Sequence, residues 1–149
     1  MKKRSLKHPV LRFLFICYCL VMLWLLFGRE FGWVDHLSYK EMLRFNIKPL
    51  YTIKNYLRVI EDGTTNSYFG HCLINLTGNI FLFIPIGFLM PFLWSAFRKF
   101  YKFLFVSLLV ILIIESIQLF LLLGCCDIDD VILNTTGFII GYFIWTIFK

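Results

Sequence analysis

Four long stretches of this sequence carry almost no charged residues, and they restrict the fold more than any other feature. They cover residues 10–27, 73–95, 103–124 and 131–148, and only Arg12 and Glu115 are charged within them. About 20 apolar residues are enough for a helix to cross a bilayer. The chain is 60% hydrophobic, above the ~45–50% of soluble domains. We therefore predict an all-α, polytopic membrane helix bundle with four transmembrane helices, in one domain over residues 1–149.

The basic residues predict how this bundle is oriented. Nine of the fifteen lie on the segments that would share one face if both termini are cytoplasmic, and none of the nine acids lies there. Short cytoplasmic segments of membrane proteins are enriched in lysine and arginine. We therefore expect an N-in, C-in protein whose basic pI reflects topology rather than nucleic-acid binding. No small-residue cleavage site follows the first span, so we interpret that span as an uncleaved anchor.

Residues 28–72 form the predicted outer loop, which mixes charged and apolar side chains. The apolar positions within residues 37–45 favour a short interfacial helix lying against the headgroups, and a second short helix could begin within residues 54–60. Cys72, Cys125 and Cys126 would lie near the outer face, where an oxidising compartment would permit a disulfide. Their spacing is not typical of a metal site.

Polar residues of three spans fall at a similar predicted depth in the outer half of the bilayer. At 1.5 Å per residue, Glu115 lies ~12 Å and Asn79 ~9 Å below the ends of their spans. Steps of three and four residues place Asp127, Asp130 and Asn134 on one helix face, together with a Gly137/Gly141 pair that should allow close helix packing within one subunit. We predict an outward-facing ligand-binding pocket formed by Asn75, Asn79, Glu115, Gln118, Asp127, Asp130 and Asn134.

Structural roles compete with this interpretation for each member. Asp127 or Asp129 could cap the fourth span and Asp130 could complement its dipole, while the asparagines could simply join helices. Glu115 is harder to explain this way, because an acid inside an apolar span is costly and usually marks function. The cluster could bind Mg²⁺ or Ca²⁺ through oxygen ligands, although nothing requires a cofactor. It could instead recognise an amine or sugar hydroxyls, or use Glu115 and Asp130 as catalytic acid and base.

Four segments in order resemble the VanZ-like family of bacterial membrane proteins, over residues 45–141. They are Asn46-Ile-Lys-Pro49-Leu, Asn75-Leu-Thr-Gly-Asn79-Ile-Phe-Leu-Phe-Ile-Pro85-Ile-Gly87, Glu115-Ser-Ile-Gln118-Leu-Phe and Asp127-Ile-Asp-Asp130-Val-Ile-Leu-Asn134-Thr-Thr-Gly137. The family's Asp-x-x-Asp element corresponds to Asp127 and Asp130, so Asp129 is an additional acid. The resemblance implies a protein of the bacterial cell membrane, in some members linked to reduced sensitivity to teicoplanin, a lipid-bearing glycopeptide antibiotic.

Three functions remain open at this point, and we rank them in order. The first is a non-enzymatic binder that holds a lipid-linked envelope precursor or a lipoglycopeptide in the polar pocket, with membrane lipid as a further partner. The second is a membrane enzyme that acts on a lipid or peptidoglycan precursor through Glu115 and Asp130. The third is a helix-bundle scaffold whose polar network is structural.

Overall fold

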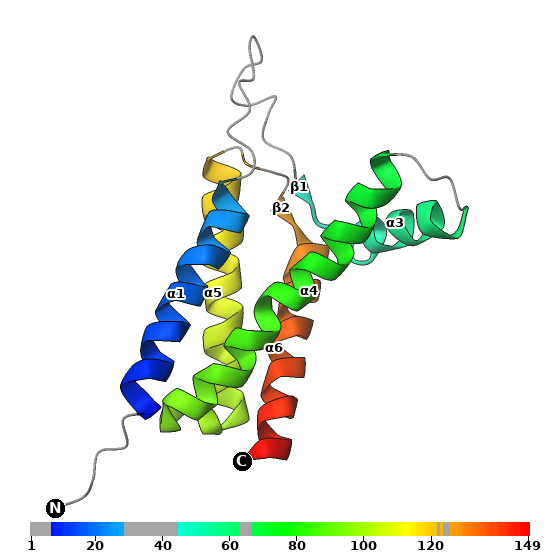
Figure 1. The fold of residues 1–149 in the computed structure, drawn as a ribbon. Coiled ribbons are helices and arrows are strands. Elements are labelled where there is room, and N and C mark those ends of the chain that lie inside the picture. Colours follow the sequence, from blue (N-terminus) through cyan, green and yellow to red (C-terminus); the bar gives the residue numbers. More distant parts are fainter. Residues whose placement is uncertain (1–6, 29–44, 63–66, 122, 124–125) are drawn as a thin grey trace, which may run out of the picture.

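The computed structural model describes residues 7–28, 45–62, 67–121, 123 and 126–149. Within these ranges, four helices are long and apolar enough to cross a membrane. They pack as a bundle in which α4 runs obliquely across α6 (Figure 1). The prediction of an all-α bundle with four spans is therefore confirmed, and the helices are α1 (Lys7–Phe27), α4 (Ser67–Leu93), α5 (Phe100–Phe120) and α6 (Ile128–Phe148).

The helix ends differ from the predicted spans where polar residues are involved. α4 begins at Ser67, before the predicted start at residue 73, and α5 already ends at Phe120. α6 begins at Ile128, so that Asp129 and Asp130 belong to its first turn. Carboxylates are favourable there because the helix dipole is positive at its N-terminus.

Shorter elements connect the spans. Strand β1 (Phe45–Asn46) pairs in parallel with β2 (Cys126–Asp127), α3 (Tyr51–Glu61) follows β1, and the 3₁₀ helix η1 (Ser95–Arg98) joins α4 to α5. The second short helix expected at residues 54–60 is present as α3, which begins earlier, at Tyr51. The interfacial helix predicted at residues 37–45 lies outside the described residues, apart from Phe45 in β1.

Glycines allow α4 and α6 to approach each other to backbone contact. A Cβ atom at Gly137 would overlap the carbonyl oxygen of Ile80, and one at Gly141 would overlap that of Ile84. A Cβ at Gly87 on α4 would overlap the backbone of Phe138 on α6. The spacing of Gly137 and Gly141 predicted close packing within one subunit, and the structure confirms it.

The interior and the outside of the bundle are both apolar. Phe83, Phe103, Ile111 and Phe138 are fully buried, whereas the outward side chains include Phe81, which is 67% exposed. Soluble proteins rarely expose so much apolar surface, whereas in a membrane lipid chains would cover it.

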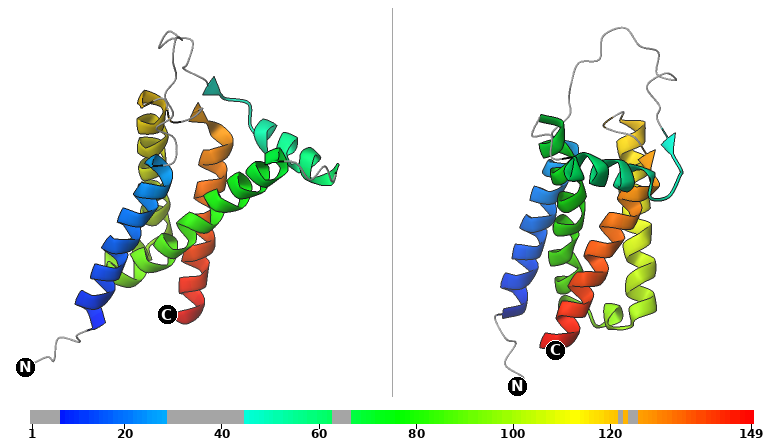
Figure 2. Two further views of the ribbon diagram at one scale, coloured as in Figure 1. Left: turned by 45° about the horizontal axis from the view of Figure 1, so that its top comes forward. Right: turned by 90° about the vertical axis from the view of Figure 1, so that its right-hand side faces the viewer.

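The two ends of the bundle differ in polarity. The start of α1 and the end of α6 lie at one end, and β1, β2 and α3 lie toward the other (Figure 2). We call the first the basic end, because it carries Arg98, Lys99, Lys102 and Lys149 and no acidic residue among those described. We call the second the polar end, and its side chains are described next.

Candidate functional site

Asp127 is the residue on which β1, α3 and α6 converge. Its extended backbone places its side chain at the N-terminus of α6, where it accepts a hydrogen bond from the backbone N–H of Asp129 at 2.9 Å. It also accepts hydrogen bonds from Asn46 Nδ2, at 3.1 and 3.2 Å, and from Thr52 Oγ1 at 2.5 Å. Asp127 is therefore the N-cap of α6, and its carboxylate is occupied by partners within the protein.

Asp129 caps a different helix from the one that carries it. Its side chain is fully buried and accepts hydrogen bonds from the backbone N–H groups of Leu50, at 2.5 Å, of Thr52, at 2.8 Å, and of Ile53, at 3.1 Å. Leu50, the N-cap residue before α3, adopts the left-handed conformation and supplies no side-chain cap of its own. The first N–H groups of a helix lack partners inside it, so Asp129 holds the start of α3 against α6.

Asp130, one residue further, faces α4. Asn79 donates a hydrogen bond from Nδ2 to Asp130 Oδ1 at 2.6 Å, and it also donates to Asn75 Oδ1 at 3.2 Å. Three of the predicted site residues thus form a chain from α6 across α4. All three are partly buried, so water does not fully replace these bonds.

Glu115 brings α5 to the same place. It is only 4% exposed, and it interacts electrostatically with the carboxylates of Asp130 and Asp127 and with the backbone N–H of Asp127. The described residues provide no lysine or arginine as a counter-charge to it. The structure therefore places acidic side chains of α5 and α6 near one another in a poorly solvated region.

Asn134 lies one turn beyond Asp130 on α6 and is 2% exposed. Its Oδ1 has no hydrogen-bond partner, and neither does Oγ1 of the adjacent Thr135. Nearly all buried polar atoms in proteins are paired, so an unpaired acceptor calls for a donor. One further turn along α6, Phe138 packs against Phe83 and Phe103 and closes the region from below.

Gln118 is placed with α1 rather than with the carboxylates. Its Nε2 donates a hydrogen bond to the carbonyl oxygen of Leu26 at 3.1 Å. The last carbonyls of a helix lack partners inside it, so Gln118 ties the end of α5 to the end of α1.

Sequence reasoning did not include three residues of this network in the site: Asn46, Thr52 and Asp129. Asn46 had a signal, because it begins the Asn46-Ile-Lys-Pro49 segment. Asp129 was visible only as a candidate cap of its own helix, and Thr52 carried no signal.

The described part of the chain contains no group of three histidine, cysteine, aspartate or glutamate side chains arranged to hold a metal ion. Nor does a disulfide join the described cysteines, and Cys125 lies outside the described residues. Burial raises the pKa of the Cys126 thiol, and the nearby carboxylates of Glu115, Asp127 and Asp130 raise it further. The pKa of Cys126 therefore depends on the charge of these carboxylates.

Comparison with protein families gives one match, to the family model described as VanZ/LLP1, over residues 15–149. That range contains every residue of the network described above. Comparison with curated proteins gave no significant match, and comparison with solved structures gave none either.

Proposed function

The chain belongs to the VanZ/LLP1 family, and from this membership we propose that it is a bacterial cell-envelope factor that binds a lipid-linked or lipid-bearing molecule at the polar end of its bundle. In this proposal both termini are cytoplasmic, because lysines and arginines gather at the basic end. The polar end then faces the exterior of the cell membrane, where envelope precursors and glycopeptide antibiotics are found.

The observation that carries the proposal is the excess of hydrogen-bond acceptors at the polar end. Asn134 Oδ1 is buried without a partner, and the buried Glu115 carboxylate has two other carboxylates near it. Toward these acceptors, the Asn79 amide donates to Asp130 and the Asp127 backbone N–H donates to Glu115. A buried acceptor without a donor costs about 1–3 kcal/mol, so a ligand that supplies amine or hydroxyl groups would be stabilised here.

The surroundings favour a ligand with a lipid portion. The site lies at the ends of apolar helices whose outward side chains are exposed, such as Ile74 and Phe120 on α4 and α5. Acyl chains could lie against this surface while a polar head group enters between the helices. A lipid-bearing glycopeptide such as teicoplanin has both parts, so we propose that the protein lowers sensitivity to it.

The test compares Glu115→Gln with Ser116→Ala in a teicoplanin-sensitive bacterial host. Ser116 is exposed, and its hydroxyl bonds to Leu112 of its own helix, so it is a neighbouring control outside the cluster. We expect the unmodified protein and S116A to raise teicoplanin tolerance and to retain a lipid-bearing molecule on purification, as detected by mass spectrometry. We expect E115Q to lose both properties at an unchanged protein level.

Two results would oppose this proposal. Unchanged tolerance with no lipid retained by any form would argue against a binder. Equal behaviour of E115Q and the unmodified protein would move the site away from Glu115.

The proximity of Glu115 and Asp130 supports a second candidate function, an enzyme acting on a lipid or peptidoglycan precursor. Two interacting carboxyl groups from different helices could serve as general acid and base. Lipid profiles of cells with and without the protein separate this function from binding, because an enzyme creates or removes a lipid species. Identical profiles would exclude it.

The hydrogen-bonded chain through Asn79 supports a third candidate, a scaffold in which the polar groups only fix the helices. This function predicts that cluster variants lose folded protein. Normal protein levels combined with lost teicoplanin tolerance would exclude it.

A further inference from the structure

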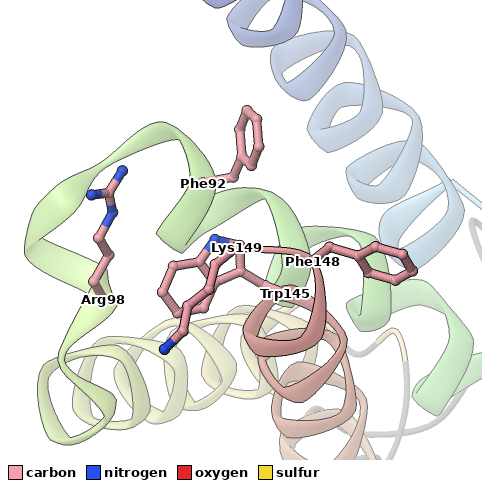
Figure 3. A pocket seen from close by; sticks show the side chains of 5 residues that line it. All are labelled: Phe92, Arg98, Trp145, Phe148 and Lys149. Atoms are coloured by element: carbon pink, nitrogen blue, oxygen red, sulfur yellow. The ribbon is translucent and has the colours of Figure 1, made fainter.

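The basic end of the bundle contains a hollow that the proposed function does not use. Its volume is about 490 Å³, and the residues that line it are Phe92, Arg98, Trp145, Phe148 and Lys149. They come from the end of α4, from η1 and from the end of α6, around the central ring of Trp145 (Figure 3). Two cationic side chains and three aromatic rings therefore share one cavity, and no aspartate or glutamate lines it.

The positive side chains of this hollow, Arg98 and Lys149, favour an anionic ligand. Arg98 uses Nε to donate a hydrogen bond to the Pro91 carbonyl at 3.3 Å, which leaves its two terminal nitrogens for another acceptor. Lys149 Nζ lies 5.4 Å from the centre of the Trp145 ring, in cation–π contact. The sequence has no aspartate or glutamate in residues 63–114 or 131–149, so no acidic side chain of these segments neutralises the two cations.

The backbone around Arg98 is fixed by the core. Tyr142 donates a hydrogen bond from its hydroxyl to the Arg98 carbonyl at 2.8 Å, and Tyr142 and Trp145 are each 6% exposed. The Trp145 ring of the hollow is thus packed into the core, whereas Arg98 and Lys149 are exposed. A ligand that binds here has to order the two charged side chains but not the aromatic ring beneath them.

The position of the hollow indicates where its ligand comes from. α4 and α6 end here and α5 begins here, so the hollow lies at the level of the lipid headgroups, where tryptophan is enriched. Phe92 is 39% and Phe148 75% exposed, and both could contact acyl chains. We propose that this hollow binds the phosphate of an anionic membrane phospholipid, with Arg98 and Lys149 contacting the headgroup and the aromatic rings contacting the glycerol and upper acyl region.

The test measures how many phosphatidylglycerol molecules the full-length protein retains in detergent, by native mass spectrometry, with phosphatidylcholine as the uncharged comparison. The double variant R98Q/K149Q is compared with K99Q/K102Q, which removes the same charge from exposed residues of the same end that do not line the hollow. At ~1 kcal/mol for each basic residue, R98Q/K149Q should bind phosphatidylglycerol about 30-fold more weakly. K99Q/K102Q should retain binding within about threefold, because its lysines do not line the hollow and so do not contact the bound phosphate.

Three outcomes would overturn the proposal. The first is an equal loss in both double variants, which would assign binding to the general surface charge. The second is equal retention of phosphatidylcholine and phosphatidylglycerol by the unmodified protein. The third is displacement of the lipid by glycerol phosphate at equal concentration, which would make the ligand a soluble phosphate ester. Because Glu115 plays no part in this site, E115Q should retain phosphatidylglycerol normally, and failure here leaves the polar-end proposal untouched.

Discussion

From the middle of α6 onward, α4 and α6 meet through backbone atoms at glycines, whereas at the start of α6 they meet through hydrogen-bonded side chains. The Gly137 and Gly141 contacts leave no room for another carbon atom. The Asn79–Asp130 contact, in contrast, sits beside a buried acceptor that has no partner at all. Close packing is a principal source of stability between helices in lipid. The difference teaches that one helix pair combines a tightly packed part with a part that holds a buried, unpaired acceptor.

The largest expected effect comes from a substitution that breaks the glycine contact between α4 and α6. In Gly141→Ala the new methyl group would overlap the Ile84 carbonyl and force α4 and α6 apart. We expect a loss of about 3 kcal/mol in the free energy of unfolding, because the obstructing atom belongs to the backbone. Equilibrium unfolding in detergent micelles measures it.

Gly78→Ala is the matched control, since no atom lies within 4 Å of a Cβ built there. It should leave stability unchanged or raise it by up to about 1 kcal/mol, because alanine is the better helix former. Equal losses in the two variants would contradict the assignment of stability to the glycine contact.

The next effect removes the cap that α6 supplies to α3. Asp129→Ala leaves the N–H groups of Leu50, Thr52 and Ile53 without their acceptor. We expect a cost of about 2 kcal/mol, expressed as faster amide hydrogen exchange at the start of α3. Glu61→Ala, at an exposed position near the other end of α3, should leave that exchange unchanged. Normal protection in D129A would show that other contacts hold α3.

A smaller effect follows from Asn79→Ala, which removes the hydrogen bond to Asp130. Hydrogen bonds between membrane helices average only ~0.6 kcal/mol, so the unfolding free energy should fall by about that amount. Thr77→Ala is the control, because its hydroxyl bonds only to Leu73 of its own helix. A loss as large as that of G141A would remove the distinction between the two parts of the helix pair.

The smallest expected effect is a shift in the pKa of Cys126 at the polar end, with the fold unchanged. Glu115→Gln removes one of the carboxylates that raise the pKa of Cys126, so that pKa should fall and the reactive thiolate should form at lower pH. The rate of Cys126 alkylation across a pH series, followed by peptide mass spectrometry, measures the shift. S116A should keep the original profile, and the same profile in E115Q would place Glu115 too far from Cys126 to matter.

The four spans could be predicted from the sequence, because the thickness of the bilayer fixes the length of uncharged chain that a transmembrane helix needs. It also brought Asn79, Glu115 and Asp130 together, since depth along apolar helices can be counted residue by residue. It could not place Asp129, whose acceptors reach amides 76 to 79 residues away. An acid in the first turn of a helix is already explained by its favourable interaction with the dipole of that helix. The sequence near Asp129 therefore gives no sign of a partner far along the chain.

Gln118 shows a second limit of the sequence. It lies three residues from Glu115 and at a similar depth, yet its amide donates to Leu26 on α1. Depth and helical period identify which residues share a level of the membrane. They do not identify which neighbouring helix each of them faces.

The cap that Asp129 provides for α3 also has a consequence for biosynthesis. The ribosome adds about 5–20 residues per second, and the chain emerges from its N-terminus. The start of α3, with the amides of Leu50, Thr52 and Ile53, therefore leaves the ribosome before Asp129 has been made. In the same way, the Asn46 side chain is synthesised before its acceptor Asp127. The polar end can therefore close only after the start of α6 has been synthesised, although α3 itself is made much earlier.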